Sequence, residues 1–134
     1  MTTARQAVVA RLKQDLAPAG AALPWVIKGS PWVPKQVNKD QPAVAVWRAS
    51  LERQGLGLVH ELTINLYLSR TADEAAEDEQ EDALDDLLTS LQRCKGATWT
   101  RAERQVWEQV ISGWQITCQF ASEDIYRQVV LAGG

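Results

Sequence analysis

The longest amphipathic pattern in the chain covers residues 71–96 and predicts one long helix. Its apolar positions recur at i, i+3, i+4 and i+7, and they are Leu84, Leu87, Leu88 and Leu91. Thr71 and Glu74 have the spacing of a capping box at the start, and Gly96 supplies the stop. Because one face of this helix is apolar, we expect it to lie on a surface formed by the rest of the chain.

A predicted hairpin precedes the long helix. Residues 42–47 begin its first strand, which sets Val44 and Val46 against Trp47 on the opposite face. Gly55 and Gly57 suit a turn that needs positive φ. The returning strand alternates strictly, with His60, Leu62, Ile64, Leu66 and Leu68 on one face and Glu61, Thr63, Asn65 and Tyr67 on the other. This is the strongest strand signal in the sequence.

A second predicted hairpin follows the long helix. Residues 97–107 have the composition of a strand, a turn is expected near Ser112 and Gly113, and residues 114–120 form the closing strand. The closing strand sets Trp114, Ile116, Cys118 and Phe120 against Gln115, Thr117 and Gln119. The long helix therefore joins two hairpins.

The N-terminal part contributes a helix, a short strand and a loop. Residues 3–16 predict a helix with Val8, Val9, Leu12 and Leu16 on one side. Residues 25–27 predict an edge strand, because prolines lie nearby. Residues 29–42 contain three prolines and form a long loop, a feature that is usually functional in a small domain. The tail, residues 122–134, is either a last extended piece or a short helix.

These elements predict a single α+β domain over residues 1–134. We expect a mixed, mainly antiparallel sheet of two hairpins joined by the long helix, with the helices packed on one face. Cys94 and Cys118 suit core packing in a reducing compartment. No secretory signal or spanning apolar run is recognisable, which predicts a soluble intracellular protein without membrane contact.

Charge is segregated along the chain. The net charge is −3, yet residues 73–86 hold nine carboxylates and no basic residue, and outside this segment 8 acidic residues stand against 14 basic ones. Six like-charge pairs at i,i+4 destabilise the acidic helix by roughly 0.2 to 0.5 kcal/mol each. A basic body with one acidic face can pack against copies of itself or lie near nucleic acid.

Candidate catalytic groups are few. His60 is the only histidine, and pairing it with Cys94 or Cys118 would give a nucleophile and base, but the spacing carries no motif. A structural role for His60 is favoured. Two isolated cysteines and one histidine lack zinc-site spacing, and the acidic run lacks the pattern of a calcium loop. The sequence therefore predicts no metal, no cofactor and no catalytic residue.

The acidic helix allows one enzymatic interpretation. The pairs Glu74/Glu77 and Asp82/Asp85 lie one turn apart, as in the magnesium-dependent nucleotide pyrophosphohydrolases of the MazG family, which they resemble. The spacing between the pairs is too short for that family, and its members are all-helical. We therefore favour a charged face turned to solvent or to a neighbouring subunit, with Glu77, Asp78, Glu81 and Asp82 as its interface candidates.

Six tryptophans are many for this length, and interfaces enrich tryptophan. We expect about half of them in the core and half at interfaces. A nucleic-acid stacking surface would need aromatic residues interleaved with basic ones, and only Trp99 with Arg101 and Arg104 resembles this. The remaining interface candidates come from the N-terminal loop and the first hairpin turn: Trp25, Trp32, Val33, Lys35, Gly55, Leu56 and Gly57.

The order of elements resembles the lambda-type tail terminator proteins of long-tailed bacteriophages. The resemblance rests on residues 42–47, residues 61–68, the acidic helix at residues 78–91 and residues 114–117. It implies a structural virion protein that forms a hexameric ring on the head-proximal end of the tail tube. The sheets would line a channel through which DNA passes without sequence-specific binding, and the helices would lie outside.

The resemblance also implies partners and a location. The partners would be further copies of the chain, the tail tube protein and a head-completion or connector protein, with residues 29–42 and 55–57 as contact elements. Assembly would take place in the cytoplasm of a bacterial host, and the protein would end in the tail-neck region of the virion. Alternatives are another neck or head-completion protein, a small acidic-faced binding module, and the magnesium-dependent pyrophosphohydrolase.

Overall fold

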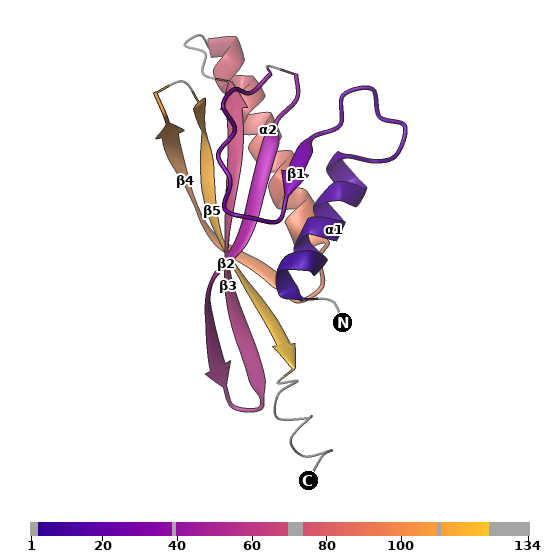
Figure 1. Ribbon diagram of the computed structural model, residues 1–134, viewed down its shortest axis with the longest axis vertical. Coiled ribbons are helices and arrows are strands. Elements are labelled where there is room, and N and C mark those ends of the chain that lie inside the picture. The colour runs from indigo at the N-terminus through magenta and orange to yellow at the C-terminus, as the bar shows by residue number, and fades with distance from the viewer. Residues whose placement is uncertain (1–2, 39, 70–73, 110, 124–134) are drawn as a thin grey trace.

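The computed structural model describes residues 3–38, 40–69, 74–109 and 111–123. Two helices and five strands follow one another along these described residues. They are α1 (Ala4–Leu16), β1 (Val26–Lys28), β2 (Ala43–Gln54), β3 (Gly57–Ser69), α2 (Glu74–Gln92), β4 (Ala97–Trp107) and β5 (Ile111–Glu123). Figure 1 shows both helices on the same side of one long, twisted sheet.

The sheet has the strand order β1-β2-β3-β5-β4. Strand β1 pairs with β2 in parallel, and the other neighbouring strands pair antiparallel. Strands β2 and β3 form one hairpin, β4 and β5 form the other, and α2 lies between the two hairpins in sequence. The predicted α+β fold with a mixed, mainly antiparallel sheet is confirmed. Because β5 returns to pair with β3, β4 is left as an edge strand.

The main core lies between the helices and the sheet. Helix α1 contributes Val8 and Leu12, and α2 contributes Leu87 and Leu91. The sheet contributes the alternating face of β3, as its pattern predicts, together with residues of its neighbours: Val44, Val46, Leu62, Ile64, Leu66, Leu68, Ile116 and Cys118. Each fully buried leucine stabilises the fold by about 1.5 to 3 kcal/mol, so Leu87 and Leu91 together outweigh the like-charge repulsion on α2.

A second, smaller core covers part of the opposite face of the sheet. Tyr67 is fully buried there, among half-buried side chains that include Trp32 from the proline-rich loop. The Tyr67 hydroxyl donates to the carbonyl oxygen of Trp32 at 2.5 Å and accepts from Asn65 Nδ2 at 3.0 Å. Gln115 Nε2 donates to Asn65 Oδ1 at 3.2 Å. This part of the loop is therefore a packed second layer.

The prediction of a turn at Ser112 and Gly113 is wrong. The chain reverses at Glu108 and Gln109, which both take positive φ, and Gly113 lies within β5 opposite Tyr67. A Cβ at Gly113 would clash with the carbonyl oxygen of Leu66 on the neighbouring strand. This glycine therefore permits a close approach of two backbones, which is the other common role of glycine in a strand.

Other predicted boundaries shift. The two-residue turn of the first hairpin is Gly55 and Leu56, and Gly55 takes φ +60 as expected. Gly57 begins β3 instead of taking part in the turn. Helix α2 ends at Gln92, before Gly96, which takes φ +91 in the connection to β4.

Two predictions concern segments that are only partly described. The proposed helix cap at Thr71 lies outside the described residues. Of the tail, residues 122 and 123 continue β5, and the remainder lies outside the described residues. The extended alternative is therefore confirmed for residues 122 and 123 alone.

Replacing Gly113 by alanine should destabilise the protein by about 3 kcal/mol or more, because β3 and β5 would have to separate to admit the methyl group. Gly20→Ala is the matched control, since open space surrounds Gly20 and only its positive φ of +86 is unfavourable. The control should lose about 1 kcal/mol. Urea unfolding of both variants measures the difference, and equal losses would contradict the close-approach role of Gly113.

Candidate interaction surfaces

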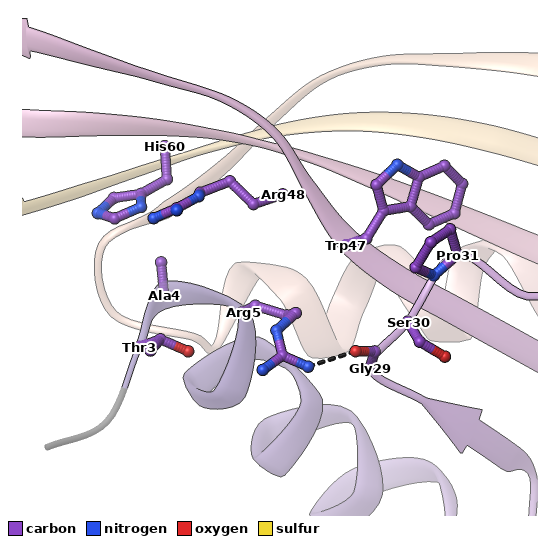
Figure 2. A pocket seen from close by; sticks show the side chains of 9 residues that line it. All are labelled: Thr3, Ala4, Arg5, Gly29, Ser30, Pro31, Trp47, Arg48 and His60. Carbon is purple, nitrogen blue, oxygen red and sulfur yellow. Dashed lines mark hydrogen bonds between the residues drawn. The ribbon is translucent and has the colours of Figure 1, made fainter.

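A pocket lies beside the start of α1 (Figure 2). Its volume is about 400 Å³, and its lining residues are Thr3, Ala4, Arg5, Gly29, Ser30, Pro31, Trp47, Arg48 and His60. They come from α1, from the segment that follows β1, and from the middle of β2 and β3. We call it the α1 pocket.

A capping box fixes where α1 begins. The Thr3 hydroxyl accepts a hydrogen bond from the Gln6 backbone N–H at 3.1 Å, and the Gln6 side-chain oxygen accepts one from the Thr3 N–H at 2.9 Å. Arg5 then donates to the carbonyl oxygen of Gly29, which joins α1 to the segment after β1 (Figure 2). Gly29 leaves room for this contact, because a Cβ there would lie 2.8 Å from the Arg5 guanidinium.

His60 forms the inner wall of the α1 pocket. Its side chain is 7% exposed, and its Nε2 lies 2.8 Å from the Ser122 hydroxyl. Its Nδ1 is buried and has no hydrogen-bond partner among the described residues. Burial lowers the pKa of His60 below 6.5, and the positive charge of Arg48 lowers it further. Figure 2 shows the Arg48 guanidinium beside the imidazole ring.

The described contacts do not build a catalytic triad. Ser122 and His60 have the separation of a nucleophile and its base, but a triad needs a carboxylate on Nδ1, and Arg48 lies beside the ring instead. The alternative pairing of His60 with a thiol is not favoured either. Burial raises the pKa of Cys118 to about 11 and also raises the pKa of Cys94, so both thiols stay protonated at neutral pH.

The acidic side of α2 faces away from the sheet. Gln80 lies on its buried side, where Nε2 donates to the Ser112 hydroxyl at 2.9 Å and to the carbonyl oxygen of Ser69 at 3.2 Å. Six exposed carboxylates on the outer side form no ion pair with another described residue; they are Asp78, Glu79, Glu81, Asp82, Asp85 and Asp86. We call them the α2 acidic face.

Glu77 differs from the α2 acidic face because it already has a partner. It accepts a hydrogen bond from Arg104 on β4 at 2.9 Å, and this bond lowers the pKa of Glu77. In the proposed magnesium-binding pair of Glu74 and Glu77, Glu77 is therefore already engaged with a cation. In the other pair, Asp82 and Asp85 are both exposed. Across the described ranges, no three His, Cys, Asp or Glu side chains gather closely enough to hold a metal ion.

A third surface is the far half of the first hairpin. Every residue of β2 from Arg48 to Gln54 is exposed, and Leu51 and Leu56 are exposed by 39% and 71%. Figure 1 shows this hairpin extending beyond the helices, beside the end of β5. We call residues 49–57 the arm. It contains the predicted interface residues Gly55, Leu56 and Gly57, which the structure places at and beside the tip.

The tryptophans do not separate into core and interface groups. All six are half-buried and pack against one of the two cores: Trp25, Trp99 and Trp114 against the main core, Trp32, Trp47 and Trp107 against the smaller one. The Lys28 ammonium lies 4.3 Å from the Trp32 ring centroid. The predicted interface residues Val33 and Lys35 are exposed on the same loop.

The structure therefore leaves the predicted interface residues in separate places. The tip of the arm, the proline-rich loop and the α2 acidic face are three distinct surfaces. Sequence reasoning missed the α1 pocket, because Arg5, Arg48 and His60 are distant in sequence and share no motif. The one available signal was a lone histidine on the apolar face of a strand.

A scan against protein-family models finds no match for this chain, and neither does a search of the curated proteins. None of the helices within the described residues is long and apolar enough to cross a membrane.

Because His60 is the only histidine, its single imidazole NMR signal should titrate with a pKa below 6.5. Replacing Arg48 by glutamine should raise the pKa of His60 towards its usual value, since it removes one of the two causes of the lowering.

The lowered pKa of His60 also means that the unfolded chain binds the proton more readily than the folded protein does. Below about pH 6.5 the free energy of unfolding should therefore fall, and His60→Gln should remove this part of the pH dependence. A pKa of His60 above 6.5 would contradict the buried, cation-facing environment.

Proposed function

We propose that this chain is a structural subunit that assembles into a ring and caps the head-proximal end of a phage tail tube. The arm is the observation that carries the proposal. Its β2 side is exposed along its whole length, and it presents Leu51 and Leu56 to solvent. Exposed apolar side chains on a projecting element are typical of a surface that a partner covers.

Two open strand edges support assembly as well. Strand β4 pairs with β5 on one side only, and β2 beyond Ala45 has no described partner on the side of β1. Exposed edges of this length favour pairing with another chain unless they are protected. Arg101, Glu103 and Arg104 interrupt the β4 edge with charge. A specific neighbour with complementary charge fits such an edge better than unspecific aggregation does.

The ring and its place in the virion follow from the resemblance to tail terminator proteins. In this proposal six copies form the ring, the sheets line the channel for DNA, and the helices lie outside. One face of the ring meets the tail tube protein and the other meets a head-completion or connector protein. The subunit forms in the bacterial cytoplasm and ends in the tail-neck region, and it carries no catalytic activity. Another neck or head-completion protein is the nearest alternative.

The α2 acidic face favours one function of a different class, a small module that binds a basic partner in place of nucleic acid. Its exposed carboxylates form a continuous negative surface. Competition with DNA for a basic partner would support this module. A pyrophosphohydrolase of the helical family is not favoured, because the fold is built on a sheet and Glu77 is paired with Arg104.

Purified protein should form a ring, which negative-stain imaging and light scattering measure. Leu56→Ser should prevent the ring and leave the monomer folded, because exposed substitutions usually change stability by less than about 0.5 kcal/mol. Leu23→Ser is the matched control, since Leu23 is also an exposed leucine, at 58%, but lies between α1 and β1. A Leu56→Ser protein that assembles like the control would show that the arm is not the contact.

Self-assembly alone does not identify the tail. Mixing the protein with tail tubes from a phage whose genome encodes the chain should place the ring at one end of each tube. Neighbouring reading frames that encode neither tail nor head-completion proteins would contradict the terminator assignment, whatever the oligomeric state.

A further inference from the structure

We infer that the α1 pocket is a carboxylate-binding site that receives an acidic side chain from the α2 acidic face of a neighbouring copy. The inference rests on the proposed self-assembly and names the two surfaces that meet. The ligand is an aspartate or glutamate side chain, and its source is a second copy of this chain.

The first support is the charge of the α1 pocket. Arg5 and Arg48 line it, and the start of the thirteen-residue helix α1 adds the positive end of a helix dipole. None of the nine described residues that line the pocket is acidic. The capping box satisfies the backbone N–H groups of Thr3 and Gln6 and not those of Ala4 and Arg5, two residues that also line the pocket.

The second support is the unsatisfied nitrogen of His60. The side chain is more than nine-tenths buried, its Nε2 is engaged with Ser122, and no residue in the described part of the chain bonds to its Nδ1. A buried polar atom without a hydrogen bond is costly, and such atoms often mark a place that a ligand fills. With the Ser122 hydroxyl donating to Nε2, Nδ1 carries the proton and can donate to a carboxylate oxygen.

The third support is the supply of carboxylates. The α2 acidic face presents six exposed carboxylates without an ion-pair partner among the described residues. Helices α1 and α2 start towards different ends of the molecule (Figure 1), so the acids near the start of α2 do not reach the α1 pocket of their own chain. A second copy brings the two opposite charges together, and this complementarity selects the copy over an uncharged partner.

Charge reversal on each side tests the pairing. Arg48→Glu changes the pocket, and the double variant Asp78→Lys, Asp82→Lys changes the acidic face at two exposed positions one turn apart. Each should weaken self-association by about tenfold or more, as expected when one partner of a close charge pair is reversed. Combining the three substitutions should restore association to near the starting value. Lys95→Glu is the control, because it makes the same charge change at an exposed position between α2 and β4, outside the pocket lining and the α2 acidic face.

The imidazole signal of His60 supplies an independent readout. A carboxylate in the pocket favours the protonated ring, so the pKa of His60 should be higher in the assembly than in the Leu56→Ser monomer. The other charged and polar residues that line the pocket are Thr3, Arg5, Ser30 and Arg48, and Ser122 contacts the His60 ring from β5. These side chains are present both in the assembly and in the monomer, so a difference in the His60 pKa reports the incoming carboxylate.

The possible results distinguish a failure of the pocket pairing from a failure of the ring. A ring that forms equally well with Arg48→Glu overturns the pocket pairing and leaves the ring intact. Failure of the unaltered chain to self-associate at NMR concentrations overturns both. A rise in the His60 pKa of the monomer on adding inorganic phosphate, with no change on assembly, assigns the pocket to free anions and overturns the neighbouring-copy source.

Discussion

The length of the strands relative to the helices is the constraint on which the rest of this structure depends. Strands β3 and β5 each have 13 residues, which is about 43 Å at roughly 3.3 Å per residue. Helix α2 has 19 residues and α1 has 13, which is about 28 Å and 20 Å at roughly 1.5 Å per residue. The helices cannot cover the whole sheet. The first hairpin therefore continues past them as the exposed arm, and the α1 pocket lies where the helical cover ends.

The same constraint explains the structural role of the proline-rich loop. One face of a sheet covered by helices leaves the other face to water, yet Tyr67 on that face is fully buried. The loop supplies the missing layer with Trp32, and the Tyr67 hydroxyl satisfies the Trp32 carbonyl. Prolines suit such a layer because they reduce the number of backbone N–H groups that need partners. The loop is thus partly core, and its exposed residues Val33 and Lys35 are the portion left for contacts.

The sequence predicted the elements wherever one period dominated locally. The alternation of β3 identified its two faces, and the leucine spacing of α2 identified its buried side. Prediction from the sequence was wrong where one residue type has two structural roles. Gly113 suggested a turn, but it permits a close strand approach, and only the partner strand reveals this. The α1 pocket was beyond prediction for a similar reason, since tertiary folding alone brings Arg5, Arg48 and His60 together.

The segregation of charge along the chain corresponds to two separate charged surfaces in the structure. Acids and bases on one surface would pair within the chain, as Arg104 pairs with Glu77. The α2 acidic face and the α1 pocket lie apart, so each copy has one donor and one acceptor. In a two-fold dimer both would be used at once and growth would stop at two copies. In a head-to-tail arrangement the open chain of copies keeps one pocket free at one end and one acidic face free at the other until the ring closes. The proposed ring fits the arm as well, because a neighbour on a further side would cover its exposed leucines and the open β2 edge.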